Sequence, residues 1–489
     1  MTKTVEPRLV RGMRDLLPEQ MLARQWMIDT IRSVYERYGF VPLNTPAIEY
    51  MDVLFGSAGE EAQKLIFTVN NPDFRGNTPE SERLGLRFDL TVPLARVVAQ
   101  YPDLPKPFRR YQVAPVWRAD KPDRGRFREF IQFDIDSVGV ESEVADVEII
   151  AAICDTLDAL GVGSYKVRFS SRKVLNLLLP FANIPEECAL AVFRAIDKVD
   201  RIGMEALRSE LTAESEPRLS ESQSELTAES KPRLSESQVE RIERFLAIRA
   251  DKRSEVIDQL RDLFANIPGA KQEIDVLERI SRHLDSLGYH DDRVVIDLSV
   301  ARGLTYYTGP VFEAVLQDAP EFGSIVGGGR YDELVMRFLG QPIPATGASI
   351  GVDRLLAALT KLGRIQSRPS TAQVLVLRID DSMMDDYLSI TYQLRRAGIP
   401  TELYLGSEKD IRKQLKYADI TRIPVAVIFG PDEKARGTVT IKDLEAGRLH
   451  ATQVESREEW LLKRPGQREV PYANLITEVI QTLQRTRSV

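Results

Sequence analysis

The sequence predicts an α+β protein of several domains, and three observations lead to this prediction. The segment 116–139 has the pattern of two strands joined by a loop, with Pro122 and Gly125 as turn formers. Helical patterns with charged faces then fill residues 170–287, which indicates an inserted helical module. From Ala372 onward strands alternate with helices, which predicts a small α/β domain with a largely parallel sheet.

The composition limits the classes of function. Of the 489 residues, 43% are hydrophobic and 28% are charged, which is ordinary for a globular protein, and the length indicates roughly three domains. No apolar run is long enough to span a membrane, and the N-terminus lacks the apolar core of a secretory signal, so we expect a cytoplasmic protein. A net charge of −7 counts against indiscriminate binding of nucleic acid, although a local basic face could hold one RNA.

The cysteines and histidines predict neither a metal site nor histidine-based catalysis. Cys154 and Cys188 lie in apolar helical patterns and are expected to be buried thiols in a reducing compartment. The three histidines, His283, His290 and His450, show neither metal-ligand spacing nor the neighbours of a catalytic triad.

The second strand of the predicted hairpin carries its polar residues at one parity. Arg128, Gln132, Asp134 and Asp136 alternate with other residues, so their side chains are expected on one face. Together with Arg118 they offer guanidinium groups for phosphate oxygens beside carboxylate and amide groups for an amine or an imidazole. An ion-paired surface hairpin explains the same residues equally well.

The chain before the hairpin is expected to form a helix followed by extended segments. Residues 19–38 have apolar residues close to helical spacing. Two prolines make 40–54 extended, either as an edge strand or as the seam of a dimer. Asp89 and Thr91 lie two apart in 87–96, a predicted apolar strand, where they either bind an ammonium group together or cap the end of the strand.

Segments after the helical module predict a second set of ligand-binding residues. Arg302 lies beside a glycine and two tyrosines, where a guanidinium can approach a ligand between aromatic walls. The three glycines 327–329 fit neither the phosphate-loop nor the dinucleotide pattern and predict a tight turn between strands. Residues 347–359 predict a strand and then an amphipathic helix with Arg354 in its first turn, where helices attract anions.

A 15-residue segment is repeated once inside the helical module. Residues 209–223 and 224–238 differ only in that Glu216 is replaced by Lys231. A single repetition is too short for a solenoid, and the Ser, Glu and Pro content is typical of a solvated extension. We therefore expect a tandem duplication without a catalytic role.

The predicted C-terminal α/β domain carries a modest basic face. Lys409, Arg412, Lys413 and Lys416 lie at helical spacing within a helix predicted over 409–417. A solvated surface is the simplest interpretation of such a run of charges.

Seven segments together resemble the histidyl-tRNA synthetases, a family with the class II synthetase fold. They are RGMRDLLP at 11–18, RFDLTVPLAR at 87–96, the hairpin at 116–139, ARGLTYYTGPVFE at 301–313, GGGRYDEL at 327–334, GVDRLLAAL at 351–359 and KQLKYAD at 413–419. The resemblance implies an antiparallel catalytic sheet flanked by helices, a helical insertion, a C-terminal α/β anticodon-binding domain, and a homodimer formed near 40–48. It also implies a histidine–tRNA ligase whose partners are L-histidine, ATP with Mg²⁺, and histidine tRNA, with no membrane.

The resemblance implies a role for each candidate site residue. The histidine α-amino group would contact Asp89, Thr91 and Gln132, the imidazole would contact Asp136 and Tyr307, and Tyr306 would line the pocket. Arg118 and Arg302 would act catalytically at the α-phosphate of ATP, with Asp120 beside them and Arg354 at the distal phosphates. Weaker tRNA contacts would come from Arg124, Arg412, Lys413 and Lys416, and no metal site formed by the protein is expected.

Three positions depart from the commonest bacterial pattern of that family. Asp120 stands where a glutamate is usual and keeps the charge, while Thr305 replaces a frequent aspartate and Ile131 a frequent histidine. The hairpin loop 120–126 also differs, so the resemblance does not define how the acceptor end of the tRNA is read.

The implied domains are bounded as follows: catalytic domain 1–169 and 290–362, helical insertion 170–289 with the duplication at 209–238, linker 363–371, and anticodon-binding domain 372–489. The main alternative is a noncatalytic regulatory paralogue, such as the subunit that serves histidine biosynthesis. Such paralogues typically lack the anticodon domain and lose active-site residues, whereas this chain has the motifs for both. A general RNA-binding protein is disfavoured by the acidic balance.

Overall fold

The computed structural model divides the chain into two compact units, which are described separately. It describes residues 5–55, 65–74, 78–123, 125–212, 234–302, 306–365, 367–446 and 466–487. The first unit comprises Met1–Arg14 and Arg24–Ile365, and the second comprises Asp15–Ala23 and Gln366–Val489. Among the helices of these described ranges, none combines the length and the apolar character needed to cross a membrane.

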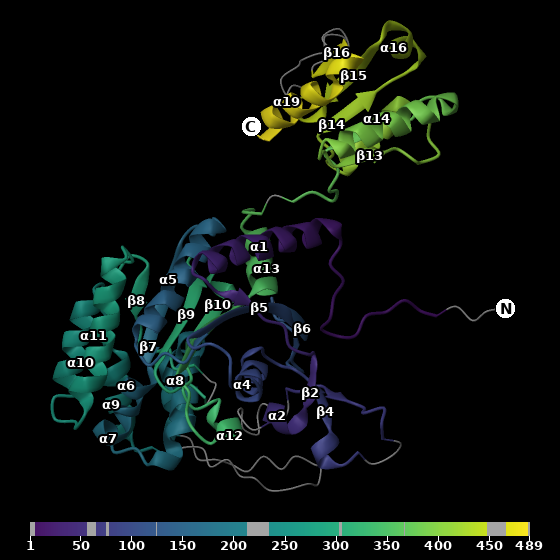
Figure 1. The fold of residues 1–489 in the computed structure, drawn as a ribbon. Coiled ribbons are helices and arrows are strands. Elements are labelled where there is room, and N and C mark those ends of the chain that lie inside the picture. The colour runs from purple at the N-terminus through teal and green to yellow at the C-terminus, as the bar shows by residue number, and fades with distance from the viewer. Residues whose placement is uncertain are drawn as a thin grey trace. The chain divides into compact units, whose positions relative to one another are not determined.

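The first unit is built on an eight-stranded sheet (Figure 1) in the order β1-β5-β6-β11-β10-β9-β7-β8. Neighbouring strands are antiparallel except at the two ends, where β1–β5 and β7–β8 are parallel. This confirms the expected antiparallel sheet, and β5 and β6 form the expected hairpin. The strands are β1 Val41–Pro42, β5 Phe108–Trp117, β6 Glu129–Val138, β7 Tyr165–Ser171, β8 Val294–Ile296, β9 Pro310–Leu316, β10 Ser324–Arg330 and β11 Ala345–Gly351.

Helices cover one face of this sheet, and the other face carries polar side chains beside an apolar cluster that packs against helix α4 (Thr91–Gln100). The first helix, α1 (Pro18–Arg37), packs its Tyr35 ring edge-on against Phe133 of β6, with ring centroids 5.1 Å apart. Figure 1 shows α5 (Val144–Ala159) and α13 (Val352–Lys361) with α1 on the sheet. Because strand side chains alternate, the parity opposite to Phe133, which includes Asp136, faces away from these helices.

Two local predictions in this unit are wrong. Residues 87–96 do not form a strand, because β4 (Leu84–Leu86) ends before them and helix α4 (Thr91–Gln100) begins at Thr91. A short apolar run fits a buried helix as well as a strand, and a proline in the first turn of a helix lacks only an N–H that would be unbonded anyway. The glycines 327–329 lie inside β10 and not in a turn.

A small three-stranded sheet lies beside the large one, in the order β2-β4-β3. It contains β2 (Ile48–Tyr50) and β3 (Thr68–Val69), and the short helices α2 (Met51–Phe55) and α12 (Met336–Leu339) belong to the same unit. Residues 40–54 were predicted to be extended, as an edge strand or as a dimer seam. Within them β1 lies at one edge of the large sheet and β2 in the small sheet, but 51–54 belong to helix α2, so the prediction is wrong for that part.

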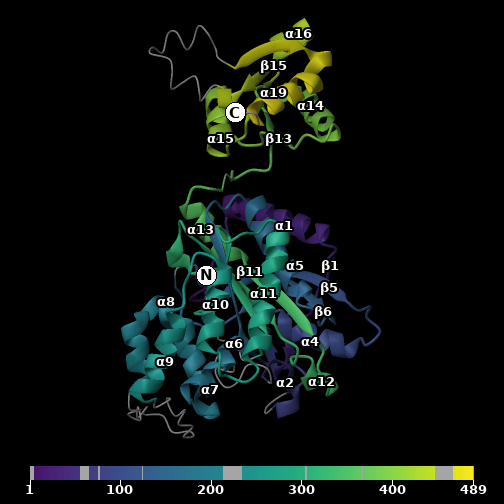
Figure 2. The same ribbon diagram turned by 90° about the vertical axis from the view of Figure 1, so that its left-hand side faces the viewer.

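The predicted helical insertion is confirmed as the group of helices between β7 and β8 (Figure 2). These helices are α6 Arg172–Asn176, α7 Leu178–Ala182, α8 Ala189–Thr212, α9 Glu236–Leu246, α10 Arg253–Leu263 and α11 Ala270–Ser286. The insertion leaves and rejoins the sheet at neighbouring points because β7 and β8 pair with each other. Cys154 is buried in α5 as predicted, whereas Cys188 is only half-buried in a short turn before α8.

The ends of the duplicated segment are part of these helices. Helix α8 includes the start of the first copy and α9 the end of the second, while residues 213–233 between them lie outside the described residues. Leu211 is 0% and Leu234 5% exposed, and the Leu234 N–H donates to the Leu211 carbonyl at 3.1 Å. The prediction of a solvated extension is therefore wrong for both ends.

The second unit carries a five-stranded sheet in the order β13-β12-β14-β15-β16. The first three strands are parallel and the last two are antiparallel, so the sheet is mixed and not largely parallel as predicted. The strands are β12 Val374–Val376, β13 Thr401–Leu403, β14 Val425–Ile428, β15 Thr438–Asp443 and β16 Gln467–Pro471, and the helices are α14 Met384–Arg396, α15 Ile411–Ile420, α16 Pro431–Arg436 and α19 Leu475–Arg487.

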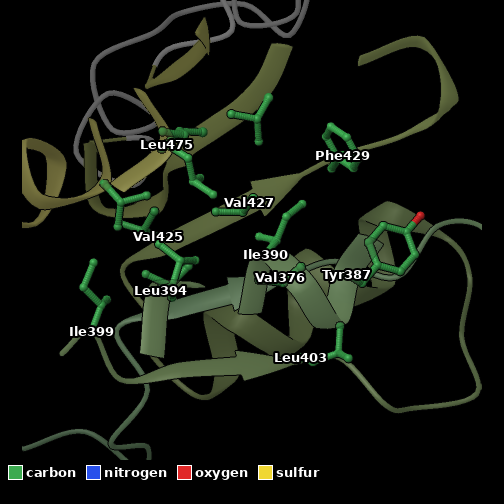
Figure 3. Close-up of a cluster of buried hydrophobic side chains, with 14 of the residues drawn as sticks. Val376, Tyr387, Ile390, Leu394, Ile399, Leu403, Val425, Val427, Phe429 and Leu475 are labelled. Carbon is green, nitrogen blue, oxygen red and sulfur yellow. The ribbon is translucent and has the colours of Figure 1, made fainter. Parts of the chain in front are cut away.

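Both faces of this second sheet are covered. Val376 and Val427 pack with Tyr387 and Leu394 of α14 and Leu475 of α19 (Figure 3). The alternate strand residues pack on the other face against α15, through Leu375, Ala426 and Ala418. Burial on both faces explains why these strands read as unbroken apolar runs.

One of the two copies of the duplicated segment should be dispensable for folding. Deleting residues 209–223 places the second copy directly after Arg208, so that an identical Ser-Glu-Leu-Thr stretch continues α8. We expect the melting temperature to change by no more than about 3 °C, because shortening the chain between two fixed points by this amount alters the closure free energy by about 1 kcal/mol. Leu211→Ala in the full chain is the comparison, because removing a buried leucine side chain costs about 2–5 kcal/mol. A deletion as damaging as Leu211→Ala would contradict the prediction.

Candidate active site

A cavity of about 380 Å³ opens on the polar face of the eight-stranded sheet. It brings together residues from the hairpin, the start of α4, the segment 302–307, β10, β11 and the start of α13. Ten predicted site residues line it: Asp89, Thr91, Arg118, Asp120, Gln132, Asp136, Arg302, Tyr306, Tyr307 and Arg354. Residues more than 200 positions apart in the sequence therefore meet at one site.

Glycines on β10 and β11 form the floor of the cavity. A Cβ atom on Gly327 would overlap the Arg302 guanidinium, and one on Gly347 would overlap the Asp136 carboxylate. A Cβ on Gly329 would lie 2.8 Å from the Tyr307 ring. The glycine run was predicted to be a turn, but its structural role is to let three site side chains lie flat on the sheet.

The strand register of the hairpin places Asp136 beside a buried arginine. Arg110 of β5 is directly opposite Asp136 of β6 and is 0% exposed. Its Nη2 lies 2.8 Å from Asp136 Oδ2, and it also donates to the Leu90 carbonyl at 3.0 Å. The Tyr331 hydroxyl donates to Asp136 Oδ1. Burial raises the pKa of Asp136 above its usual range, and Arg110 opposes this rise.

Asp89 caps helix α4 and keeps one oxygen free for a ligand. Its Oδ1 accepts a hydrogen bond from the Val92 N–H at 3.0 Å, an arrangement typical of residues before a helix. Asp89 Oδ2 and Gln132 Oε1 are both buried, and neither has a hydrogen-bond partner among the described residues. Burial raises the pKa of Asp89 to about 6. Two unpaired acceptors in one cavity suit a ligand that donates several hydrogen bonds.

Four arginines line the same cavity: Arg118, Arg126, Arg302 and Arg354. Arg118 Nε donates to the Phe88 carbonyl at 2.9 Å, and Arg354 Nη1 donates to the Ser324 carbonyl at 2.7 Å. Arg302 lies 6.0 Å from the Tyr307 ring centroid and 3.9 Å from Glu313, and it pairs with neither Asp89 nor Asp136. Burial and the charges of neighbouring arginines lower the pKa of Arg354. Mutual repulsion of this kind makes the cavity a site for a polyanion.

Helix α13 is tied to the hairpin by the residue before Arg354. Asp353 Oδ2 accepts from the Ile131 backbone N–H at 2.6 Å, and Oδ1 pairs with Arg14 at 2.7 Å. The Arg14 guanidinium in turn stacks on Phe127 of the hairpin loop, 3.7 Å from the ring centroid. These contacts fix the distance between Arg354 and β6. They use only the backbone of Ile131, so the side chain at this position, which departs from the family pattern, takes no part in them.

The tyrosines form an aromatic wall at the Asp136 end. The Tyr306 ring centroid lies 4.8 Å from that of Tyr307 and 6.0 Å from that of Tyr331. Thr305, one of the departures from the family pattern, lies outside the described residues.

The hairpin loop departs in part from the prediction. Asp120 Oδ2 lies 3.9 Å from Arg126 Nε at the mouth of the cavity, whereas Arg124 lies outside the described residues. Arg128 does not line the cavity, because β6 begins only at Glu129 and the Arg128 side chain donates to the Asp120 carbonyl at 3.1 Å.

Sequence reasoning missed four residues of the site: Arg110, Tyr331, Asp197 and Arg126. Arg110 could have been found from the hairpin register, since it pairs across the strands with Asp136. Asp197 comes from α8 of the helical insertion, and no local pattern links it to the sheet. In the described ranges, no group of three His, Cys, Asp or Glu side chains could hold a metal ion.

The predicted basic face of the second unit is only partly free. Helix α15 begins at Ile411, so Lys409 precedes it and pairs with Asp381 at 2.6 Å. Lys413 pairs with Glu408 at 2.7 Å. Arg412 and Lys416 lie one helical turn apart with exposed side chains.

The chain matches two family models in sequence. Residues 12–355 match the histidyl-tRNA synthetase model, and residues 373–464 match the anticodon binding domain model. The first match spans the whole of the cavity and the helical insertion.

Full-length relatives and a solved structure agree with these matches. The histidine–tRNA ligase of Dinoroseobacter shibae is 43% identical, with 99% of each chain covered, and that of Cereibacter sphaeroides is 44% identical, with 96% of each covered. The crystal structure of histidyl-tRNA synthetase from Nostoc sp. PCC 7120 is 32% identical with a TM-score of 0.79, covering 98% of this chain and 100% of that one. Fold and site thus define an aminoacyl-tRNA synthetase. The chain belongs to the histidyl-tRNA synthetase family.

The raised pKa of Asp89 predicts a pH-dependent cost of folding. With a folded pKa of about 6 and an unfolded value near 3.9, the folded state binds more protons between these two pH values. The stability that this extra proton gives is present below about pH 4 and is lost as the pH rises through about 6. We therefore expect the melting temperature of Asp89→Asn, relative to the wild type, to rise from pH 4 to pH 6.5 and then level off. Asp103→Asn, at an exposed position, controls for loss of a carboxyl group. A difference in melting temperature between Asp89→Asn and the wild type that does not change with pH would contradict the raised pKa of Asp89.

Proposed function

We propose that the chain activates L-histidine with ATP to histidyl-adenylate in this cavity and transfers the histidine to the 3′ end of histidine tRNA. The observation that carries the proposal is the division of charge along the cavity. The Arg118 guanidinium lies over the ring of Phe130 on β6. Phe130 and Asp136 are six residues apart on this strand, which corresponds to a length of about 20 Å. The buried carboxylates of Asp89 and Asp136 lie toward one end. Toward the other end, Arg118, Arg126, Arg302 and Arg354 outnumber the carboxylates of Asp120 and Asp197, as a molecule that joins an amino acid to a nucleotide phosphate requires.

The amino-acid end is assigned to histidine. Its ammonium group would bind the free Asp89 Oδ2 and Gln132 Oε1, with Thr91 beside them. Its imidazole would lie between Asp136 and Tyr307, with Tyr306 as the wall. Arg110 and Tyr331 already hold the Asp136 carboxylate in place, which supports its use as an oriented acceptor for a ring N–H.

The nucleotide end is assigned to ATP. Arg118 and Arg302 would contact the α-phosphate, Arg354 the distal phosphates, and Asp120 would lie at the cavity mouth beside them. In the reaction a histidine carboxylate oxygen bonds to the α-phosphorus and pyrophosphate leaves. No enzyme side chain forms a covalent bond, so catalysis would come from holding the reactants in line and from guanidinium groups that meet the developing charge.

Magnesium is assigned to the substrate and not to the protein. Mg²⁺ keeps several water and phosphate ligands and needs only one or two carboxylates. Of the two cavity carboxylates beside the arginines, Asp197 already contacts the backbone of Arg302, so Asp120 is the candidate for this role.

The remaining parts of the chain are assigned to tRNA binding and to assembly. Residues 372–489 would bind the anticodon, with Arg412, Lys413 and Lys416 as candidate phosphate contacts and Arg124 as a candidate contact for the acceptor end. Residues 1–169 and 290–362 would form the catalytic domain, 170–289 its insertion and 363–371 the linker.

A second copy of the chain would pack along 40–48. The edge strand β1 supports this, because its Val41 is 49% exposed, and Ile48 of β2, at the edge of the small sheet, is 43% exposed. A homodimer would cover this apolar edge, and a cytoplasmic location agrees with the free thiols of Cys154 and Cys188.

The alternative of a noncatalytic regulatory paralogue is less well supported. Such a protein has no need of the anticodon domain, yet residues 373–464 match that domain model. The cavity also keeps every residue proposed for activation that lies in the described ranges.

Asp136→Asn tests the histidine assignment together with the overall reaction. The wild type should exchange labelled pyrophosphate into ATP only when histidine is present, and it should charge histidine tRNA. The variant should require about 10-fold more histidine, because its side chain is uncharged and has one acceptor oxygen in place of two, and weakening a charged hydrogen bond in this way costs about 1–3 kcal/mol. Its requirement for ATP should change by less than about twofold, since Asp136 lies at the other end of the cavity.

Asparagine is preferred to alanine here because it keeps a side chain beside the buried Arg110. Histidine-independent exchange by the wild type would refute the proposed reaction. An equal rise in the histidine and ATP requirements of the variant would refute the role of Asp136 alone.

A further inference from the structure

Arg302 has an unusual backbone conformation. Its φ angle is +50°, in the left-handed region that residues other than glycine rarely occupy and at a cost of about 1 kcal/mol or more. The guanidinium from this backbone lies flat over Gly327, at the centre of the cavity floor. A rarely populated conformation persists only where its surroundings hold it, so neighbouring groups must hold Arg302 in place.

The backbone of Arg302 is held by a residue of the helical insertion. The Asp197 carboxylate, on α8, accepts a hydrogen bond from the backbone N–H of Arg302, and Asp197 itself lines the cavity. Arg172, at the start of α6, donates to the carbonyl of the preceding residue, Ala301, at 3.4 Å, and stacks on Phe193 of α8 at 4.4 Å. Asp197 of α8 and Arg172 of α6 thus act on the chain at 301–302, and Phe193 of α8 packs against Arg172.

The same helix is connected to the guanidinium of Arg302 by a chain of ion pairs. Asp200, three residues after Asp197 on α8, pairs with Arg168 of β7. Arg168 also pairs with Glu313 of β9 and lies 3.1 Å from Asp297. Glu313 then lies 3.9 Å from Arg302 Nη1. Arg302 is therefore held at its backbone by Asp197 and at its guanidinium by Glu313, and α8 contributes to both.

The place of Asp197 requires an explanation beyond packing. A carboxylate in a cavity that binds a polyanion repels the ligand, so its charge lowers affinity unless it has a compensating effect. An ion pair that only stabilised the insertion could lie outside the cavity, as Lys198 and Glu210 do on the same helix at 2.8 Å.

We propose that Asp197 is a positioning residue for the activation step: it fixes the left-handed backbone of Arg302, so that the helical insertion sets where the catalytic guanidinium lies. The inference rests on the proposed function, because it assumes that Arg302 contacts the α-phosphate. It assigns the insertion a part in adenylate formation, in addition to any contact with tRNA.

The test compares Asp197→Ala, Asp197→Asn and the control Glu210→Gln in the full-length protein without tRNA. The kcat and KM of histidine-dependent pyrophosphate exchange and the melting temperature are measured for each. We expect Asp197→Ala to lower kcat on the order of 10-fold or more, since small misplacements of a reacting group have effects of this size. The KM for histidine and for ATP should change by less than about threefold, because neither ligand is held by Asp197.

The conservative variant separates positioning from folding. Asp197→Asn keeps an oxygen that accepts from the Arg302 N–H, so its kcat should lie between those of the alanine variant and the wild type. Glu210→Gln should match the wild type.

A kcat within twofold of the wild type for Asp197→Ala would overturn the inference, as would a fall in kcat matched by an equal loss of folded protein. If Asp197→Ala does not fold, the kcat of Asp197→Asn decides between the two outcomes. A threefold or greater fall in its kcat would support the inference, and a smaller fall would overturn it. Absence of exchange in the wild type would instead refute the proposed function on which the inference rests.

Discussion

The repulsion among the arginines above the glycine floor is the constraint on which the site depends. Arg118, Arg126, Arg302 and Arg354 share one cavity, and burial together with the charges of the other three lowers the pKa of Arg354. Backbone carbonyls of Phe88 and Ser324 hold two of the guanidinium groups without neutralising them. The unneutralised charge remains available for phosphate, and because the donors are already in place, little reorganisation is needed when charge develops in the transition state.

The opposite end of the cavity shows the converse electrostatics. Burial raises the pKa of Asp89 and of Asp136, so each carboxylate is more costly to ionise in the empty site than in water. An ammonium group or an imidazole N–H that enters would offset this cost. The two ends therefore favour one ligand that is cationic at its amino-acid part and anionic at its phosphate part, which is the chemical character of the histidine–ATP pair.

Much of this site could be predicted from the sequence, because hairpin parity and recognisable motifs are local signals. Because the polar residues of β6 alternate with apolar ones, Gln132 and Asp136 could be predicted to share one face. The pattern of a helix that begins near 352 likewise predicted that Arg354 lies in its first turn. The errors have physical causes. An apolar run such as 87–96 suits a helix and a strand alike, and a glycine run suits a turn as well as a strand that must let side chains lie close to it. Asp197 could not be assigned a role from local patterns, because its partner is set by tertiary packing, whereas Arg110 could have been found only from the register of the hairpin.

The central claim, that Arg302 stabilises charge at the α-phosphate, is tested most directly by Arg302→Ala. Single-turnover formation of histidyl-adenylate is measured together with the affinities for histidine and ATP and the melting temperature, with Arg282→Ala, at an exposed position on α11, as the control. The account predicts a rate on the order of 100-fold lower, with both substrates still bound and the melting temperature nearly unchanged, because the guanidinium acts chiefly in the transition state. A near-normal rate, or a loss explained by unfolding and by weaker binding of both substrates, would contradict it.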